Sequence, residues 1–332
     1  MKPILCNYYL TYRCNARCSF CDIWRNRRYP KNASANIDTV LRNLTELKSL
    51  GIRFIDFTGG EPLLYPELPR VLRHARKLKM LTSVTTNCLL YPQRAEQIKK
   101  LVSFLHFSLD SMIPAQHDEL RGVPAFDSVM KSIDIAKALG EKPDLLFTVT
   151  EYNYSAAEAL VRFSQQQRLI LILNPVFKHL SQKSLSQQVL DFLNQFKNEP
   201  YIYMNRAFHH FRRHGGNQIE RPRCKAVSST IVISPENDLL LPCFHFACEK
   251  IPVKTSISAV RSSAKFMQIQ KMQGRYSFCS GCSINCYFEP SFTVSFNFYT
   301  WLSLYSKARY IIDKYVRAKL ENLLKRHEPD TT

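Results

Sequence analysis

Three cysteines near the start of the chain constrain its fold and chemistry more than any other feature. Cys14, Cys18 and Cys21 have the spacing C-x3-C-x2-C and directly follow an apolar segment, Leu5–Thr11, that is typical of a β-strand. A loop at the end of a strand can place three thiolates around one small metal centre. Three thiolates suit an iron–sulfur cubane with one iron left open, because four-iron clusters normally take four cysteines.

Two other interpretations of these thiols are weaker. Structural zinc needs four ligands, and the histidine nearest to this loop in the sequence is His74. Unlinked core cysteines are disfavoured by the spacing and by polar neighbours such as Asn15, Arg17 and Ser19.

Short apolar runs alternate with longer amphipathic stretches up to about residue 200. The expected strands are Leu5–Thr11, Ile52–Thr58, Leu81–Thr86, Phe104–Leu109, Leu145–Thr150 and Leu169–Asn174. The expected helices are Ile37–Leu50, Leu68–Leu78, Gln93–Val102, Ser128–Leu139 and Ala156–Gln166. This α/β alternation predicts a partial (β/α)6 TIM-like barrel, two units short of closure. In such sheets functional residues lie where strands end and loops begin.

The pattern changes after about residue 200. The basic, histidine-rich segment Ala207–Cys224 is typical of a linker or surface loop. Two short apolar runs, Thr230–Ile233 and Leu239–Leu241, predict a hairpin. A cysteine-rich, loop-like region is expected from there to Cys286.

The sequence from Cys14 to Cys21, CNARCSFC, places an aromatic residue, Phe20, immediately before the last cysteine. It resembles the signature loop of the radical S-adenosylmethionine (SAM) superfamily. The resemblance implies a catalytic [4Fe-4S] cluster on Cys14, Cys18 and Cys21, with SAM on the open iron and Phe20 at the cofactor. In that family an electron from the cluster cleaves SAM to methionine and a 5′-deoxyadenosyl radical, and the protein supplies orientation and water exclusion.

The ends of the next two strands agree with this resemblance. The motif TGGEP, from Thr58 to Pro62, resembles the family's GGEP motif, which contacts the SAM amino group. Its glycines let the backbone approach a ligand, and Glu61 offers a negative partner to an ammonium group. The motif TTN, which ends at Asn87, is similar to the family's T-N-G stretch, although Cys88 occupies the usual glycine position.

Polar residues also end the later strands. Ser108 and Asp110 resemble family residues near the ribose and methionine of SAM. Thr150, Asn153 and Asn174 follow on strands five and six, where each could equally serve as a strand-end cap or turn former. The residues predicted to bind the cofactor are Phe20, Gly59, Gly60, Glu61, Pro62, Asn87, Ser108, Asp110, Thr150 and Asn174.

Six of the eleven cysteines lie between Cys224 and Cys286. A disulfide framework would need an export signal, and the clustering favours metal binding. The arrangement resembles the SPASM/twitch extensions of the same superfamily, and the cysteine number favours one auxiliary [4Fe-4S] cluster. The ligands assigned to it are Cys224, Cys243, Cys279 and Cys282, with Cys286 as the first substitute. A zinc knot is the alternative, and Cys6 and Cys88 are interpreted as small buried hydrophobes.

The formal net charge of +19 favours an anionic partner, with a solvated basic surface as the alternative. Two groups of arginines could form an anion-binding rim around the site. They are Arg13, Arg17, Arg25, Arg27 and Arg28, and Arg206, Arg212, Arg213, Arg221 and Arg223.

The segment from Ser291 to Tyr305 is rich in aromatic residues, and a basic amphipathic stretch follows it as far as Leu320. This order suits an interfacial anchor on an anionic membrane, and packing of the tail on the barrel is slightly favoured over it. The tail is too short and polar to span a bilayer. The start of the chain shows no signal-peptide pattern, so a cytoplasmic location is expected. If the tail is an interfacial anchor, peripheral membrane contact is expected as well.

We therefore predict three domains: a radical SAM barrel over residues 1–200, a SPASM/twitch-like domain over residues 201–290, and a helical tail over residues 291–332. The predicted function is reductive cleavage of SAM, followed by hydrogen abstraction from an organic substrate that is anionic, lipid-linked or phosphorylated. A flavodoxin or ferredoxin is the expected reductant, and no nucleic acid is expected. The alternative is a basic, zinc-binding, non-catalytic protein that binds nucleic acid, which leaves TGGEP unexplained.

Overall fold

The computed structural model describes residues 2–177 and 184–317. In these ranges the strands form one ten-stranded sheet with the order β10-β9-β8-β1-β2-β3-β4-β5-β6-β7. The strands are β1 (Leu5–Thr11), β2 (Phe54–Gly59), β3 (Leu81–Thr86), β4 (Phe104–Ser108), β5 (Asp144–Val149), β6 (Leu171–Pro175), β7 (Ile202–Tyr203), β8 (Thr230–Ile233), β9 (Asp238–Leu241) and β10 (Glu249–Pro252).

The helices connect these strands and follow them. They are α1 (Ile37–Ser49), α2 (Leu68–Lys77), α3 (Tyr91–Ile98), α4 (Pro114–Arg121), α5 (Phe126–Ala138), α6 (Ala157–Gln167), α7 (Gln187–Asn194), α8 (Arg206–Arg213), α9 (Ala226–Ser229), α10 (Ile257–Arg261), α11 (Ala264–Met272), α12 (Asn285–Thr293) and α13 (Phe298–Ile311). A π-helical segment, Ile312–Arg317, continues α13.

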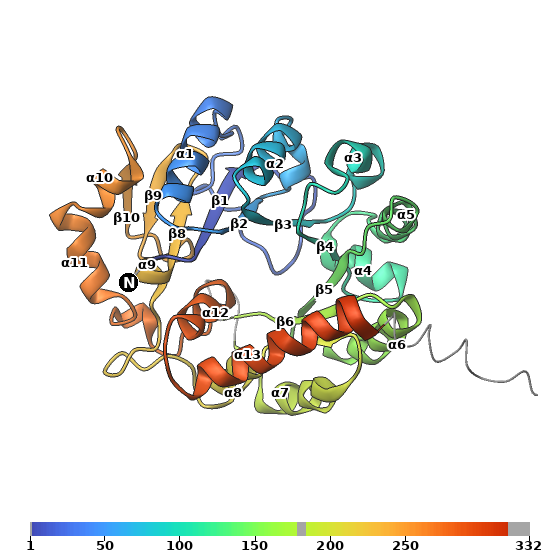
Figure 1. The fold of residues 1–332 in the computed structure, drawn as a ribbon. Helices are drawn as coiled ribbons and strands as arrows, with labels where there is room; N and C mark the ends of the chain where they lie inside the picture. Colours follow the sequence, from blue (N-terminus) through green and yellow to red (C-terminus); the bar gives the residue numbers. More distant parts are fainter. Residues whose placement is uncertain (1, 178–183, 318–332) are drawn as a thin grey trace, which may run out of the picture.

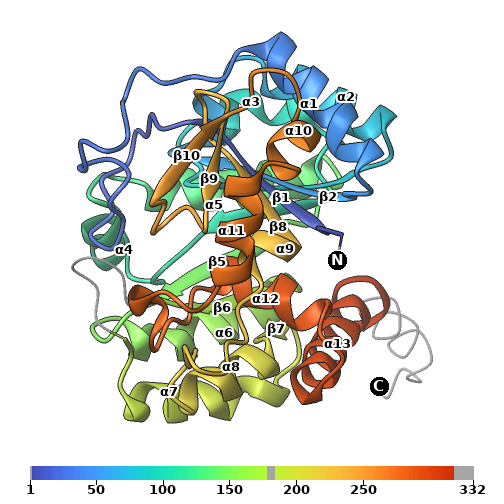
Figure 2. The same ribbon diagram turned by 90° about the vertical axis from the view of Figure 1, so that its left-hand side faces the viewer.

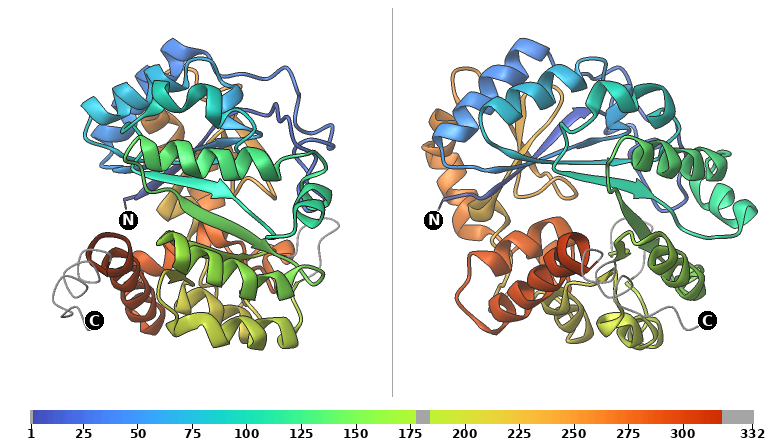
Figure 3. Two further views of the ribbon diagram at one scale, coloured as in Figure 1. Left: turned by 90° about the vertical axis from the view of Figure 1, so that its right-hand side faces the viewer. Right: turned by 45° about the vertical axis from the view of Figure 1, so that its right-hand side comes forward.

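The sheet is a curved, open barrel whose outer side is covered by helices. Strands β1 to β7 run parallel, and the blue to green helices α1 to α6 follow the convex side of the arc (Figures 1 and 3). Strands β10 and β7 are the two edges of the sheet. The predicted α/β class and partial barrel are therefore confirmed.

Side chains alternate between the two faces of this sheet, as the strand geometry requires. Ile55 and Phe57 of β2 are fully buried in the core that the outer helices cover. Asp56, between them, points to the inner side, and the strand register places Asn7 and Ser83 beside it. The interior of the barrel is therefore polar at this level, whereas its outer layer is apolar.

The six predicted strands are all present, and β1 and β3 match to the residue. The prediction of a loop over Ala207–Cys224 is wrong in its first part, where α8 forms. The side chain of Asn205 accepts hydrogen bonds from the backbone of Ala207 and Phe208 and so caps this helix. Phe208 and Phe211 are buried, so the histidine-rich composition concealed an amphipathic helix.

The predicted hairpin exists, and it continues the sheet of the barrel. Strand β8 pairs in parallel with β1, and β9 and β10 add antiparallel strands beyond it (Figure 2). The loop-like region expected up to Cys286 contains β10, α10 and α11, so that expectation is wrong. Domain boundaries near residues 200 and 290 stay a prediction.

The described part of the tail packs on the barrel, and buried polar contacts help to hold it there. Lys314 Nζ donates to Asp144 Oδ1 at 2.6 Å, and Tyr310 Oη donates to the other carboxylate oxygen at 2.7 Å. Asp144 begins β5 and is buried, as is Lys314. The backbone N–H of Tyr201 donates to Asp313 in the same region. Packing of the tail is thus observed, and the predicted residues beyond Arg317 lie outside the described ranges.

We expect Lys314→Met to lower the free energy of unfolding by about 3 kcal/mol, because it leaves the Asp144 carboxylate buried without its cation. The matched control is Lys307→Met, since Lys307 forms a half-exposed pair with Glu289 at 4.0 Å. That change should cost less than about 1 kcal/mol. Urea unfolding of both variants measures the difference, and equal losses would contradict this account of how α13 is held.

Candidate functional site

The cysteine loop after β1 is held by backbone hydrogen bonds to the end of α4. The N–H groups of Arg17 and Ser19 donate to the carbonyls of Arg121 and Leu120, both at 2.9 Å. Gly122 follows with φ of +65°, and a Cβ there would lie 2.6 Å from the carbonyl oxygen of Arg17. Only glycine fits this contact without a shift of the loop.

The two glycines of TGGEP also serve this loop. A Cβ on Gly59 would lie 2.0 Å from the carbonyl oxygen of Thr11, and one on Gly60 would lie 2.1 Å from that of Arg13. The N–H groups of Gly60 and Glu61 donate to the same two carbonyls. The glycines therefore bring the end of β2 against the cysteine loop, whereas the sequence suggested an approach to a ligand.

Two thiols of the loop are buried enough to resist ionisation. Burial, with a smaller contribution from the nearby charge of Cys18, raises the pKa of Cys14 to about 12 and that of Cys21 to about 11. Cys18 is buried, and Arg121 Nη1 lies 3.8 Å from its sulfur. In residues 2–177 and 184–317, no three His, Cys, Asp or Glu side chains form a group that could hold one metal ion.

Arg121 is a site residue that the sequence reasoning missed. Its Nη2 lies 2.7 Å from Asp110 Oδ2, and its guanidinium lies 5.4 Å from the centre of the Phe20 ring. Arg121 and Asp110 are both buried, and Asp110 also accepts from the backbone N–H of Thr148. Among the described residues, Nε of Arg121 has no hydrogen-bond partner. Arg121 lies in the polar segment HDELRG, from His117 to Gly122, whose sequence does not predict that this arginine is buried.

Glu61 joins the ends of β2 and β3. Its carboxylate accepts from the backbone N–H groups of Leu63 at 3.0 Å and Asn87 at 2.9 Å. Burial raises the pKa of Glu61, and these hydrogen bonds oppose the shift. Asn87 Nδ2 in turn donates to Asn15 Oδ1 in the cysteine loop at 2.8 Å. Glu61 and Asn87 therefore fix the loop, and Pro62 begins the short 3-10 turn Pro62–Leu64.

The remaining predicted cofactor residues occupy different roles. Ser108 is buried at the end of β4. Thr150 donates through its backbone N–H and its hydroxyl to Asn153 Oδ1. Such a local side-chain contact is typical of a residue that stabilises a turn. Asn174 accepts a hydrogen bond from Asn285 of α12 at 3.0 Å, so it links β6 to the C-terminal region.

The four cysteines assigned to the auxiliary cluster line one apolar pocket. Cys224, Cys243, Cys279 and Cys282 share this pocket with aromatic side chains, among them Phe246 and Tyr287. Burial raises the pKa of Cys243 and of Cys282 to about 12. Cys286 does not line the pocket, although it packs against the same hydrophobic cluster as Cys224 and Cys282, and Cys248 is exposed.

Asn217, which the sequence reasoning also missed, organises this pocket. Its side chain donates to the carbonyls of Gly274 and Cys279 and accepts from the N–H groups of Arg223 and Cys224. Its backbone N–H donates to the carbonyl of Cys282 at 3.0 Å. One buried asparagine, through its side chain and its backbone N–H, therefore contacts the backbone of three of the four cysteines. A single asparagine inside a basic segment gives no sequence signal of this kind.

Arg212 connects this pocket to the end of β6. It donates to the carbonyls of Pro175 and Val176 and to that of Ser283, next to Cys282. Burial lowers the pKa of Arg212 to about 9, and the nearby negative charge of Cys282 opposes this shift. Arg28 is similarly bonded to three carbonyls, those of residues 244, 245 and 247. Neither arginine belongs to an exposed rim, whereas Arg13 and Arg27 are exposed.

Comparisons with known proteins agree with this geometry. The model of the radical SAM superfamily matches residues 8–164. GTP 3′,8-cyclase of Clostridium acetobutylicum is 29% identical over 143 residues, which cover 42% of this chain and 45% of that protein. Fe-coproporphyrin III synthase of Methanosarcina barkeri is 29% identical over 177 residues, which cover 51% of this chain and 42% of that protein. The chain thus spans less than half the length of these relatives.

Solved structures share the fold. SuiB of Streptococcus suis bound to S-adenosylmethionine has a TM-score of 0.68 and 20% identity, and the match covers 83% of this chain and 70% of SuiB. Native anSMEcpe with bound AdoMet has a TM-score of 0.64 and 15% identity, covering 97% of this chain and all of that one (100%).

We expect Arg121→Leu to lower the free energy of unfolding by about 3 kcal/mol at pH 8, because Asp110 would remain as an unpaired buried carboxylate. Burial already raises the pKa of Asp110, and the Arg121 charge holds that rise back. Without the arginine the folded-state pKa rises further, so the stability that is kept at low pH is lost as the pH increases through it.

Urea unfolding of the metal-free chain at pH 5 and pH 8 measures this effect. The loss caused by Arg121→Leu should be larger at pH 8 than at pH 5. The double variant Asp110→Asn/Arg121→Leu is the control and should remove most of the pH dependence. A loss of the same size at both pH values would rule out the pair as its source.

Proposed function

Residues 8–164 of this chain form a radical SAM domain, and on that premise we propose that the chain is an enzyme that cleaves SAM reductively. The proposed ligands of its [4Fe-4S] cluster are Cys14, Cys18 and Cys21. The observation that supports this most directly is the loop that carries the three cysteines, which is bonded to the ends of β2 and α4, with Arg121 beside Cys18. When bound, the cluster and SAM supply a radical that removes hydrogen from a substrate carbon.

The residues of the loop fit an iron–sulfur cluster in charge and burial. Burial and the negative charge of neighbouring cysteines raise the pKa of Cys14 and Cys21, so these thiols do not ionise readily unless a cation is nearby. Iron would offset that cost, as metal ions do for coordinating thiols. Arg121 adds a fixed positive charge beside Cys18.

The roles of the protein at this site are binding and positioning. Glu61, Asn87 and Gly60 hold the cysteine loop against the strand ends, as their hydrogen bonds support. The Nε–H of Arg121, which has no hydrogen-bond partner in the described residues, is the proposed donor to the carboxylate of SAM. Ser108 completes the polar wall of the cofactor site at the end of β4.

We propose a second [4Fe-4S] cluster on Cys224, Cys243, Cys279 and Cys282. Their shared pocket and its aromatic lining support this set. Asn217 and Arg212 fix the loops that present the thiols, and Arg212 also contacts the end of β6. The second site is thereby joined to the barrel edge at which the strands end.

The proposed substrate is an anionic organic molecule, and the proposed electron donor is a flavodoxin or ferredoxin. Exposed arginines next to the cysteine loop, among them Arg13, Arg17 and Arg27, support recognition of negative charge. The radical SAM domain favours this enzyme over the alternative of a zinc protein that binds nucleic acid.

We expect Cys18→Ala to abolish formation of 5′-deoxyadenosine from SAM under a strong reductant and to lower the iron content by about four of eight atoms. Cys6→Ala is the control, because Cys6 is fully buried on the outer face of β1. That variant should keep both iron and SAM cleavage. Undiminished cleavage by Cys18→Ala would refute the assignment of the first loop.

We expect Cys279→Ala and Cys282→Ala each to lose about four iron atoms while the first cluster remains. Cys286→Ala should retain all of its iron, because Cys286 lies outside the four-cysteine pocket. Iron analysis and electron paramagnetic resonance after anaerobic reconstitution measure both results. Loss of the second cluster from Cys286→Ala would contradict the proposed ligand set, and stoichiometric zinc in place of the lost iron would favour a zinc knot.

A further inference from the structure

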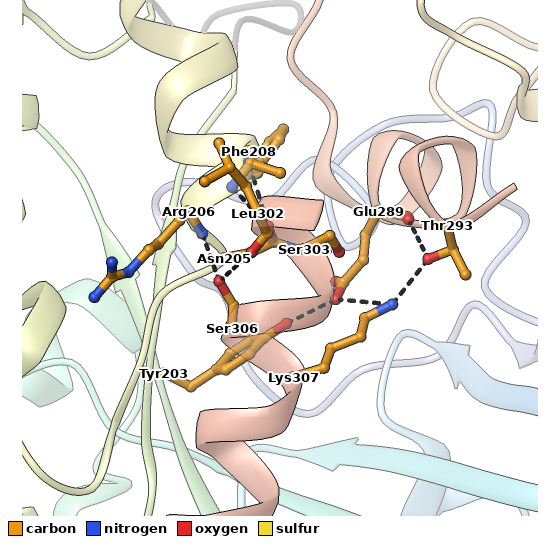
Figure 4. Close-up of polar contacts among 11 residues, drawn as sticks. Tyr203, Asn205, Arg206, Phe208, Glu289, Thr293, Leu302, Ser303, Ser306 and Lys307 are labelled. Carbon is orange, nitrogen blue, oxygen red and sulfur yellow. Dashed lines mark hydrogen bonds and ion pairs between the residues drawn. The ribbon is translucent and has the colours of Figure 1, made fainter. Parts of the chain in front are cut away.

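Helix α13 is attached to the protein by Tyr299 and Leu302, which pack against Phe211, Phe288 and Phe292, and by several polar side chains. The Oγ of Ser306 accepts from the backbone N–H of Arg206 at 3.0 Å, and Asn205 Nδ2 donates to the Oγ of Ser303 at 3.3 Å (Figure 4). Lys307 lies beside Glu289 of α12 in the same view. The buried residues of the helix and its extension are Thr300, Ser303, Ser306, Asp313 and Lys314.

The outer side of the helix is apolar. Trp301 is 67% exposed, Phe298 is 58% exposed and Ile311 is 54% exposed. The exposed large apolar residues recur at spacings of three, four and seven, which places them on one side of a helix. They are Phe298, Trp301, Leu304, Tyr305, Ile311, Ile312, Tyr315 and Val316, which we call the outer face. A surface helix normally keeps its large apolar residues inward, so an exposed apolar row of this length indicates an interaction site.

Positive charges border the outer face. The guanidinium of Arg206 lies 4.4 Å from the centre of the Tyr305 ring, and Lys307 and Arg309 are partly exposed on the helix itself. From Pro290 to Arg317 the sequence contains one carboxylate, Asp313, which is buried and bonded to Arg317. The net charge of the whole chain is +19.

We propose that the outer face is a docking surface for an anionic lipid bilayer, on which α13 lies in the plane of the interface. Its apolar row would enter the boundary between headgroups and acyl chains, and the bordering cations would lie at the level of the lipid phosphates. Tryptophan and tyrosine are the residues that favour this boundary. No helix in the described ranges is long and apolar enough to cross a bilayer, so the contact is peripheral.

The charges favour a bilayer over a second copy of the chain. A two-fold contact through the outer face would place the same patch on both partners. Arg206 and Arg309 of one copy would then lie close to those of the other, and the one carboxylate between Pro290 and Arg317, that of Asp313, is buried. Like charges opposed in this way disfavour association. An anionic surface has no such cost.

The test is co-sedimentation of the full chain with vesicles of phosphatidylcholine alone and of phosphatidylcholine mixed with phosphatidylserine. Binding to the anionic vesicles is expected, and added salt should weaken it. Trp301→Ser/Tyr305→Ser should lower the partition coefficient about tenfold, because two large aromatic side chains no longer leave water. Ile311→Ser/Ile312→Ser provides a second variant of the same face. In the unmodified chain, lipids brominated near the headgroup should quench the fluorescence of Trp301. This is the part of the tryptophan signal that Trp301→Ser removes.

The matched control is Tyr152→Ser, because Tyr152 is also exposed but lies in the loop after β5. Its partition should equal that of the unmodified chain, and all variants should keep their iron content. Absence of vesicle binding, equal binding of the outer-face variants, or no preference for anionic lipid would each overturn the proposal. Concentration-dependent self-association that the outer-face variants remove would assign the face to a second copy instead.

Discussion

Close contact between backbone segments around the cysteine loop is the constraint on which the rest of the site depends. The loop lies between the end of β2 and the end of α4, and it bonds to both through backbone N–H and carbonyl groups. Side chains larger than glycine at residues 59, 60 and 122 would intrude on that contact. The positions of the thiols are therefore set by backbone contacts in which the thiols themselves take no part. Arg121 then brings a charge to Cys18 from the same turn that clamps the loop.

The C-terminal cysteine pocket and the barrel belong to one connected framework. Asn285 of α12 donates to Asn174 at the end of β6, and Arg212 binds the carbonyls that follow in the same segment. The C-terminal region therefore reaches the strand ends at which cofactor sites form in this class of sheet. A shift of α12 or α8 would be transmitted to the wall of the barrel.

The sequence predicted the parallel strands well because their apolar runs are short, β-branched or aromatic and separated by helical periodicity. The spacing of the six C-terminal cysteines also led to the assignment of four of them as ligands, and these four line one pocket in the structure. Residues that act through backbone contacts were not predictable in this way. Asn217 and Arg121 are polar side chains in polar segments, and their roles follow from burial that only the folded chain provides. Helix α8 was concealed for a related reason, since its buried positions alternate with histidines and arginines.

The parallel pairing of β8 with β1 has a consequence for folding during synthesis. Strand β1 is an interior strand of the sheet, and one of its two neighbours is β2, which follows it closely in the chain. The other neighbour ends at Ile233, so the second edge of β1 is unpaired until more than two hundred residues have left the ribosome. Unpaired strand edges are prone to pair with other chains. This edge of β1 therefore stays open to such pairing until β8 has been synthesised.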